Sequence, residues 1–202
     1  MKASMRQVIV LTIIAVASAL VLSMVYNFTY DPIQRNRAAA LEGSILAVLP
    51  GAVDFNVIEA ELTERIDDDR STVRSTPSSD SGPLMLYQGL DESGKAVGFA
   101  FVGEGAGYGG IVKIMVGVDH NTELISGLEV LEHAETPNLG SKIEDASFRN
   151  QFIVKGLNDP LTVGQDIDKV SGATVSSNAV TAAIKGQYAL ALEAYKEAVK
   201  NE

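Results

Sequence analysis

An uncharged apolar run near the N-terminus dominates the hydrophobic pattern of this chain. Residues 8–25 read VIVLTIIAVASALVLSMV, with Thr and Ser as their only polar residues. At about 1.5 Å per residue, a helix of this length nearly crosses a hydrocarbon core of about 30 Å. Tyr26, Phe28 and Tyr30 follow with aromatic side chains suited to a membrane interface. The pattern predicts one transmembrane helix, residues 1–30 as an N-terminal anchor, and the lipid bilayer as a partner.

A cleaved signal peptide is the alternative interpretation of this segment. Lys2 and Arg6 would form its basic N-terminal region, and Ala17-Ser18-Ala19 would be its cleavage site. The apolar run continues beyond that site, which favours an uncleaved anchor. Arg35 and Arg37 follow the run, so basic residues are nearly balanced on its two sides and do not set the orientation. We expect a short N-terminal tail and a long translocated domain, because that arrangement is the commoner one.

Helical spacing recurs twice in the rest of the chain. Between residues 32 and 49 the apolar positions lie near helical spacing, which predicts a helix that Pro50-Gly51 ends. A second, amphipathic helix is predicted to run to about Val199, because apolar residues recur there at intervals of three and four. Its apolar positions are Val180, Ile184, Tyr188, Ala191, Tyr195 and Val199.

Strand signals fill the region between these helices. Residues 84–90 and 96–102 flank a turn at 91–94, and residues 111–118 and 123–131 flank another, which predicts two hairpins. One mainly antiparallel sheet packed with helices would give an α+β domain.

The segment between the first predicted helix and this sheet is less regular. Residues 53–62 fit either a strand or a helix, and the polar, Ser- and Pro-rich residues 67–83 indicate a surface loop or insertion. We therefore expect a connecting helix and polar insertion at 31–83, followed by a domain core at 84–202.

Composition excludes several classes of chemistry. The chain of 202 residues is 46% hydrophobic, enough for one sizeable core. The absence of Cys excludes disulfides, thiolate-held iron–sulfur clusters and haem attached through cysteines. Its two histidines, His120 and His133, are not at a paired-ligand spacing, so we expect no metal site. The net charge of −10 makes nucleic acid a poor partner, because phosphate binding needs a basic surface.

A Gly-rich string at residues 105–110, GAGYGG, has the spacing G-x-G-x-x-G. In a dinucleotide-binding site this string opens a helix whose N-terminus faces the pyrophosphate. Here the following residues, IVKIMVGV, are β-branched and typical of a strand. We therefore interpret the string as a turn before a strand and not as a nucleotide site.

The string Asp168-Lys169-Val170-Ser171-Gly172-Ala173-Thr174 carries more specific chemistry. Its pattern, D-x-x-S-G-A-T, resembles the recognition sequence of the bacterial flavin transferase, which esterifies the phosphate of FMN onto a Thr hydroxyl. The matching acceptor is Thr174. Gly172 and Ala173 would leave room for the transferase and for a bulky ribityl phosphate. The alternative is a Ser- and Gly-rich turn leading into a helix with Ser176 as its N-cap.

A second string, HAETPNLGSKIE at residues 133–144, follows the last predicted strand and could close over a planar ligand. Taken with GYGG at 107–110 and D-x-x-S-G-A-T, it resembles the G subunit of the Rnf electron-transport complex, which typically has H-x-E-T-P-G-L-G-D-K-I-E here. The resemblance covers the chain from the membrane anchor to about Tyr188. Asn138 and Ser141 depart from the family's usual Gly and Asp. Because Asn tolerates positive φ, the turn can survive the first change.

The resemblance implies a membrane flavoprotein that relays electrons. It implies a single-pass subunit of a bacterial or archaeal cytoplasmic membrane, with its FMN-bearing domain on the outer, periplasmic side. This redox subunit would work in an ion-translocating ferredoxin:NAD oxidoreductase complex, beside other membrane and cytoplasmic subunits, with no independent turnover. The flavin transferase would attach FMN covalently to Thr174 through a phosphoester during maturation.

The resemblance also implies roles for individual residues. Asp168 would serve recognition by the transferase. The residues expected to line the phosphate are Ser171, Gly172 and Ala173. Those expected near the isoalloxazine, as positioning residues, are Glu135, Thr136, Leu139 and Gly140. No catalytic acid or base is expected, because the redox chemistry belongs to the flavin.

Three alternative functions stay open. The related C subunit of the sodium-pumping NADH:quinone reductase is flavinylated at the same type of motif, although the short chain and the loop at 133–144 favour the Rnf interpretation. A membrane-tethered binding or assembly domain would have no redox role. A hydrolase has little support, because no Ser/His/Asp order or paired-carboxylate site stands out in the sequence.

Overall fold

The N-terminal part of the molecule is a single long helix. The computed structural model describes residues 2–60 and 84–200, in two compact units, Met1–Glu42 and Gly43–Glu202. Helix α1 (Lys2–Val48) contributes to both units. The helices predicted near the N-terminus and at 32–49 are parts of this one element. Pro32 lies inside it and removes one backbone hydrogen bond without ending the helix.

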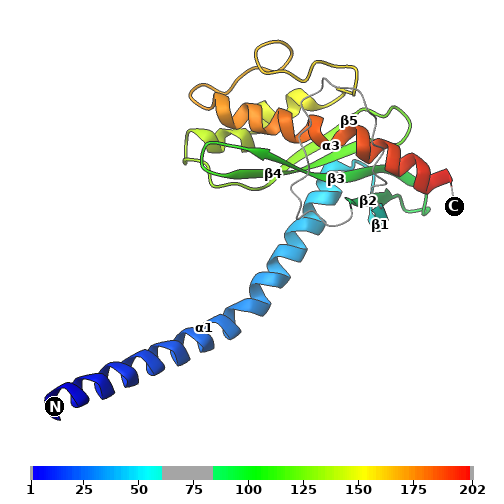
Figure 1. The fold of residues 1–202 in the computed structure, drawn as a ribbon. Helices are drawn as coiled ribbons and strands as arrows, with labels where there is room; N and C mark the ends of the chain where they lie inside the picture. The colour runs from blue at the N-terminus through cyan, green and yellow to red at the C-terminus, as the bar shows by residue number, and fades with distance from the viewer. Residues whose placement is uncertain (1, 61–83, 201–202) are drawn as a thin grey trace, which may run out of the picture. The chain divides into compact units, whose positions relative to one another are not determined.

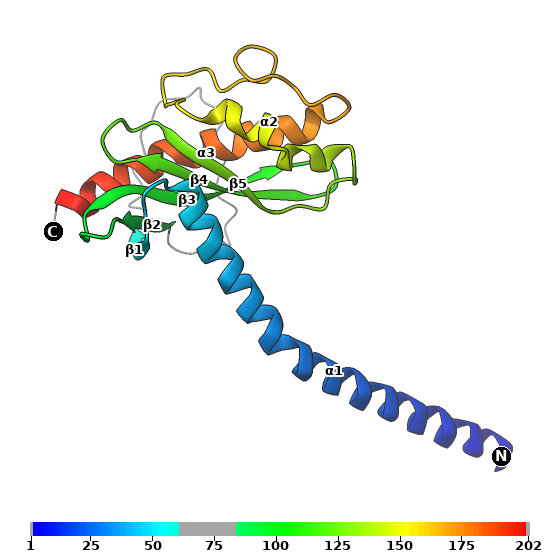
Figure 2. The same ribbon diagram turned by 180° about the vertical axis from the view of Figure 1, so that it is seen from behind.

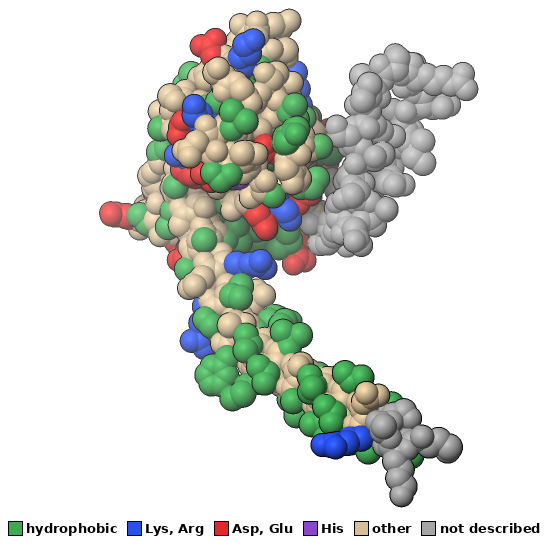
Figure 3. Space-filling view, turned by 90° about the vertical axis from the view of Figure 1, so that its left-hand side faces the viewer, with side chains coloured by type: hydrophobic (Ala, Val, Ile, Leu, Met, Phe, Trp, Pro, Cys, Tyr) green, Lys and Arg blue, Asp and Glu red, His purple; other side chains and the backbone are tan. Residues whose placement is uncertain are grey.

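The surface of α1 in the first unit is apolar and exposed. The side chains of residues 5–40 are exposed throughout, and Figure 3 shows hydrophobic side chains over much of this segment. In the part of the chain that the structure describes, α1 is the helix long and apolar enough to cross a membrane, over Met5–Val48. Lipid would cover such a surface, which agrees with the predicted transmembrane helix.

The second unit is built on a five-stranded antiparallel sheet in which neighbours in sequence are neighbours in space. Both predicted hairpins are confirmed, and residues 54–60 resolve the ambiguity at 53–62 as a strand, although residues 61 and 62 lie outside the described ranges. The predicted insertion at 67–83 also lies outside them. The strands are β1 (Asp54–Ala60), β2 (Leu84–Leu90), β3 (Ala96–Ala106), β4 (Ile111–Asp119) and β5 (Ile125–Glu132).

The position of β1 bears on the predicted domain organisation. β1 pairs with β2 along its whole length, from Asp54 opposite Leu90 to Ala60 opposite Leu84. The sheet therefore starts within the range 31–83 that was expected to hold only a helix and an insertion. The boundaries at residues 30 and 83 stay predictions.

Helix α3 (Thr174–Lys200) covers one face of the sheet, as Figures 1 and 2 show. The predicted amphipathic helix is confirmed, and it begins at Thr174, before its first predicted apolar position. Tyr195 stacks on Phe99 of β3 with ring centroids 4.4 Å apart. A Cβ at Gly103 or Gly105 would lie 2.7 or 2.0 Å from a carbonyl oxygen of α3. Glycine therefore lets the helix backbone rest directly on β3.

The C-terminal turn of α1 packs on the opposite face of the sheet. Val48 and Leu49 are buried there, and the Ser126 hydroxyl donates a hydrogen bond to the Val48 carbonyl at 2.7 Å. A Cβ at Gly117 would lie 2.1 Å from the same carbonyl oxygen, and one at Gly127 would lie 2.6 Å from the Val48 Cα. Four adjacent strands contribute to this surface, which we call the glycine seat: Gly89, Gly98, Gly117 and Gly127.

A chain of short helices links the sheet to α3. These helices are η1 (Gly140–Glu144), α2 (Ala146–Arg149) and η2 (Asn150–Phe152). Their apolar side chains Ile143, Phe148 and Phe152 are buried in the core. An irregular segment from residue 153 to residue 173 then leads to the first residue of α3.

We predict that Gly117→Ala destabilises the domain by about 1–3 kcal/mol, because the new methyl group collides with the last turn of α1 in the glycine seat. Gly43→Ala is the matched control, since a Cβ at Gly43 meets nothing within 4 Å and Ala is the better helix former by about 1 kcal/mol. Denaturant unfolding of the full-length protein in detergent measures both. Equal stability of the two variants would contradict the close packing.

Candidate functional site

The acceptor string lies in the turn that leads into α3. Thr174 is the first residue of the helix and is exposed, as are Ser171 and Gly172, whereas Ala173 is buried. Gly172 has φ +78°, a conformation that glycine adopts without strain. Ser176 is not the N-cap, because α3 already begins two residues earlier. The structure therefore presents the predicted hydroxyl on an accessible turn.

Two side chains hold this turn in place. The buried Ser177 hydroxyl donates to the Ala173 carbonyl at 2.9 Å and accepts a bond from the Val170 N–H at 3.3 Å. Gln151 accepts from the Asp168 N–H at 2.7 Å. The side chain of Asp168 is left exposed. Sequence reasoning missed Ser177 and Gln151, because a supporting hydrogen bond leaves no spacing pattern.

Glu135 connects the second string to the acceptor turn. Its side chain is only 6% exposed. One carboxylate oxygen, Oε2, accepts a hydrogen bond of 2.6 Å from the Ser176 hydroxyl. The other, Oε1, accepts from the N–H groups of Tyr108 and Gly109 at 2.7 and 3.1 Å. Three segments far apart in sequence therefore meet at one carboxylate.

Hydrogen bonds keep this buried carboxylate ionised. Burial by itself raises the pKa of Glu135, but the bonds from the Ser176 hydroxyl and from two backbone N–H groups outweigh it. Together they hold the pKa below its ordinary value of 4.5. The site thus contains a buried negative charge whose partners are nearly all neutral hydrogen-bond donors.

Glycines make room for the carboxylate. A Cβ at Gly107 would lie 2.2 Å from Oε1, and one at Gly140 would lie 2.3 Å from Oε2. Residues 107–110 of the Gly-rich string form the turn between β3 and β4, as predicted, and its first two residues end β3. β4 follows the turn where a dinucleotide site would have a helix. Its contact with Glu135 was not predicted, because no sequence spacing relates the two segments.

The rest of the 133–144 loop lies against the acceptor turn. The Leu139 side chain is so close that a Cβ at Gly172 would lie 2.6 Å from its Cδ1, yet 45% of it stays exposed. Thr136 is exposed. Asn138 has φ +60°, so it adopts the turn conformation expected of it. Ser141 accepts a hydrogen bond from the Asn138 N–H at 2.9 Å through its hydroxyl.

His133 supports the start of this loop. Its Nδ1 accepts a hydrogen bond from the Glu135 N–H at 3.0 Å, and its Nε2 lies 2.9 Å from Glu144 Oε1. An accepting Nδ1 places the proton of the neutral ring on Nε2, which then donates to Glu144. This bond joins the first and last residues of the 133–144 loop.

These residues fit a phosphate ester that carries a planar group. The 27-residue helix α3 directs its N-terminal dipole and first N–H groups toward the turn, which favours an anion there. Three apolar side chains of the segments that meet here are exposed, namely Tyr108, Leu139 and Val175. Among the described residues, no group of three or more His, Asp or Glu side chains could hold a metal ion.

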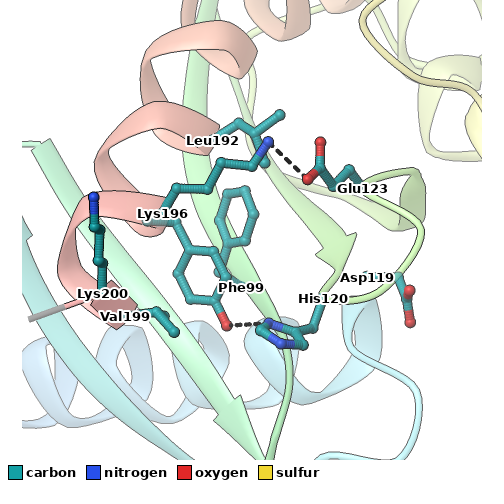
Figure 4. A pocket seen from close by; sticks show the side chains of 9 residues that line it. Phe99, Asp119, His120, Glu123, Leu192, Lys196, Val199 and Lys200 are labelled. Atoms are coloured by element: carbon teal, nitrogen blue, oxygen red, sulfur yellow. Dashed lines mark hydrogen bonds and ion pairs between the residues drawn. The ribbon is translucent and has the colours of Figure 1, made fainter. Parts of the chain in front are cut away.

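A pocket of about 260 Å³ lies at the other end of α3 (Figure 4). Leu192, which lines it, is 18 positions after Thr174, or about 27 Å along a helix. Four of the polar side chains that line the pocket form two pairs. Lys196 binds Glu123 at 2.7 Å, and His120 Nδ1 lies 3.0 Å from the Tyr195 hydroxyl. The pocket is therefore separate from the acceptor turn.

Comparisons with known proteins find one family and several relatives. Residues 107–189 match the model of the FMN-binding domain family. The G subunit of the ion-translocating oxidoreductase complex of Methanosarcina acetivorans is 28% identical over 89% of this chain and 89% of its own. The G subunit of the Na(+)-translocating ferredoxin:NAD(+) oxidoreductase complex of Acetobacterium woodii is 25% identical over 87% of this chain and 86% of its own.

Solved structures show the same fold. The crystal structure of NqrC from Shewanella oneidensis is 18% identical, with a TM-score of 0.61 over 83% of this chain and all of that one. The C subunit of the Na(+)-translocating NADH-quinone reductase from Parabacteroides distasonis has a TM-score of 0.54 over 77% of this chain and 93% of that one, again at 18% identity. The α+β fold predicted from the sequence is confirmed.

We predict that Ser177→Ala loosens the acceptor turn and costs about 1–2 kcal/mol, because it leaves the Val170 N–H without its partner and removes one of the two hydrogen bonds to the Ala173 carbonyl. Denaturant unfolding measures the cost, and hydrogen exchange at the Val170 amide measures the loosening. Ser171→Ala, at an exposed position of the same turn, is the control and should stay within about 0.5 kcal/mol of wild type. Unchanged exchange at Val170 would contradict the supporting role.

We also predict that the stabilising effect of the Glu135 charge disappears in acid. The pKa of Glu135 is lower in the folded than in the unfolded protein, so its contribution is fully present above pH 4.5. It is lost as pH falls through the folded-state pKa below that value. The free energy of unfolding of wild type minus that of Glu135→Gln should therefore shrink as pH falls to about 3. A difference independent of pH would contradict an ionised Glu135.

Proposed function

We propose that this chain, whose residues 107–189 match the FMN-binding domain family, carries FMN covalently on Thr174 and relays electrons in an ion-translocating oxidoreductase complex. Its relatives over nearly the whole chain are subunits of such complexes. The observation that carries the proposal is the exposed hydroxyl of Thr174, at the first residue of α3 and at the end of D-x-x-S-G-A-T.

The turn suits attachment of the FMN phosphate by a second enzyme. Ser171 and Gly172 are exposed, so a flavin transferase can approach the Thr174 hydroxyl without displacing a bulky side chain. A phosphodiester on Thr174 would keep its negative charge at the N-terminus of α3, where the helix dipole and N–H groups stabilise it. Asp168, exposed at the start of the turn, is available for recognition by the transferase.

The protein's own residues would bind and orient the cofactor. Bound FMN supplies the redox chemistry, since it accepts and donates electrons. Thr136 and Leu139 are exposed on the loop beside the acceptor turn, and we place them next to the isoalloxazine ring. Glu135 and Gly140 belong to the same loop but are buried, and they would position its exposed residues beside the ring.

We further propose that α1 anchors the protein in the cytoplasmic membrane of a bacterium or archaeon as a single span, with the flavin domain on the outer side. The exposed apolar surface of α1 supports the span. Partners would then be the other subunits of the complex and the bilayer. The transferase must act on the same side of the membrane as Thr174.

A role as the C subunit of a sodium-pumping NADH:quinone reductase is the second candidate. The likeness to two solved structures of that kind of protein favours it. At 18% identity this likeness shows the fold alone, whereas the relatives that cover most of the chain are G subunits. The partners with which the protein is purified would distinguish the two complexes.

We predict that Thr174→Ala abolishes covalent flavin, because the acceptor oxygen is gone, whereas Thr174→Ser keeps a hydroxyl at this position and keeps the modification. The measurement is intact-protein and peptide mass spectrometry after production together with a flavin transferase. Wild-type protein made without the transferase is the control. An unmodified wild type under these conditions, or a flavin on Thr174→Ala, would overturn the proposed attachment and favour a tethered domain without a redox role.

A further inference from the structure

We propose that Glu135 is a positioning residue, whose buried carboxylate sets the place of Thr174 for flavin attachment by tying the first turn of α3 to the Gly-rich turn. This role rests on the proposed function. It differs from the contact with the isoalloxazine that the family resemblance implies, because it acts through hydrogen bonds inside the protein.

The bonds join parts of the chain that lie far apart in sequence. Ser176, whose hydroxyl donates to Glu135 at 2.6 Å, is two residues after the acceptor and in the same helical turn. The N–H groups of Tyr108 and Gly109 lie 27 and 26 positions before Glu135 in sequence. The start of α3 is therefore held to the β3–β4 turn through one side chain.

Packing leaves the carboxylate one place to lie. Gly107 and Gly140 face its two oxygens, and a Cβ on either would approach to within 2.3 Å. A Cβ at Gly140 would also lie 2.9 Å from the Ser176 hydroxyl oxygen. Because glycine alone fits at both positions, the carboxylate cannot move aside without losing its partners. The position of Ser176, and with it the start of α3, follows from that of Glu135.

The carboxylate has little capacity left for a direct contact with flavin. A carboxylate has about four acceptor sites, and three of those on Glu135 are occupied by protein donors. With 6% of the residue exposed, little of it is accessible to a ligand. Glu135 therefore acts on the acceptor by way of Ser176 and not by touching the cofactor.

The Glu135→Gln variant separates the effect of the three hydrogen bonds from the effect of the negative charge. In Glu135→Gln the amide oxygen can accept from the two backbone N–H groups, and the amide N–H can donate to Ser176, because a hydroxyl both donates and accepts. All three bonds survive in this variant, whereas Glu135→Ala removes them all. A role in positioning predicts that Gln replaces Glu and that Ala does not.

The experiment measures the rate of flavin attachment to full-length protein by a flavin transferase. We expect Glu135→Ala to slow attachment about ten- to a hundredfold, since misplacement of a reacting group by about 1 Å costs as much. Glu135→Gln should stay within about threefold of wild type, and Ser176→Ala, which removes one bond of three, should lie between them. Hydrogen exchange at the Tyr108 and Gly109 amides should speed up in the Ala variant alone.

Gly117→Ala is the control for stability, because it destabilises the domain at the glycine seat on the opposite face of the sheet. It should be modified at the wild-type rate even if it is as unstable as Glu135→Ala. Attachment to Glu135→Ala at the wild-type rate, or a Gln variant as slow as the Ala variant, would overturn the positioning role alone. Absence of flavin from wild type would instead overturn the proposed function.

Discussion

The sheet is held between two helices that approach it more closely than any side chain allows. On one face the carbonyl oxygens of α3 occupy the space where Cβ atoms of Gly103 and Gly105 would lie, and on the other the end of α1 fills the glycine seat. Interiors pack densely, so such contacts fix the helices in register with the strands. The contacts with β3 at Ala179 and Ala183 hold the body of α3 on the sheet, and its first turn is held separately.

The buried carboxylate of Glu135 then holds the first turn of α3 in place. Desolvation would make an ionised Glu135 costly by itself, but three hydrogen bonds compensate for the lost water. The result is a connection between the acceptor turn, the 133–144 loop and the Gly-rich turn that depends on all three. The Glu of the H-x-E-T-P string in this chain therefore has a structural role that does not require contact with a cofactor.

The sequence predicted the parts of the site better than their connections. Alternating and helical periods located both hairpins and α3, because each period follows from which side chains a sheet or helix buries. The continuity of α1 through Pro32 was not predicted, because proline usually ends a helix. Here the helix continues on both sides of Pro32 although one backbone hydrogen bond is lost. The bond between Glu135 and Ser176 joins residues 41 positions apart. Only the folded sheet brings them together, so no local pattern could show it.

The spread of the site along the chain has a consequence for biogenesis. The donors and acceptors that fix the start of α3 come from β3–β4, from the loop after β5 and from α3 itself. A polypeptide that lacks any one of these elements does not offer its threonine in the native pose. Under the proposed function, covalent attachment of FMN would then depend on complete folding, and misfolded copies of the domain would stay without flavin.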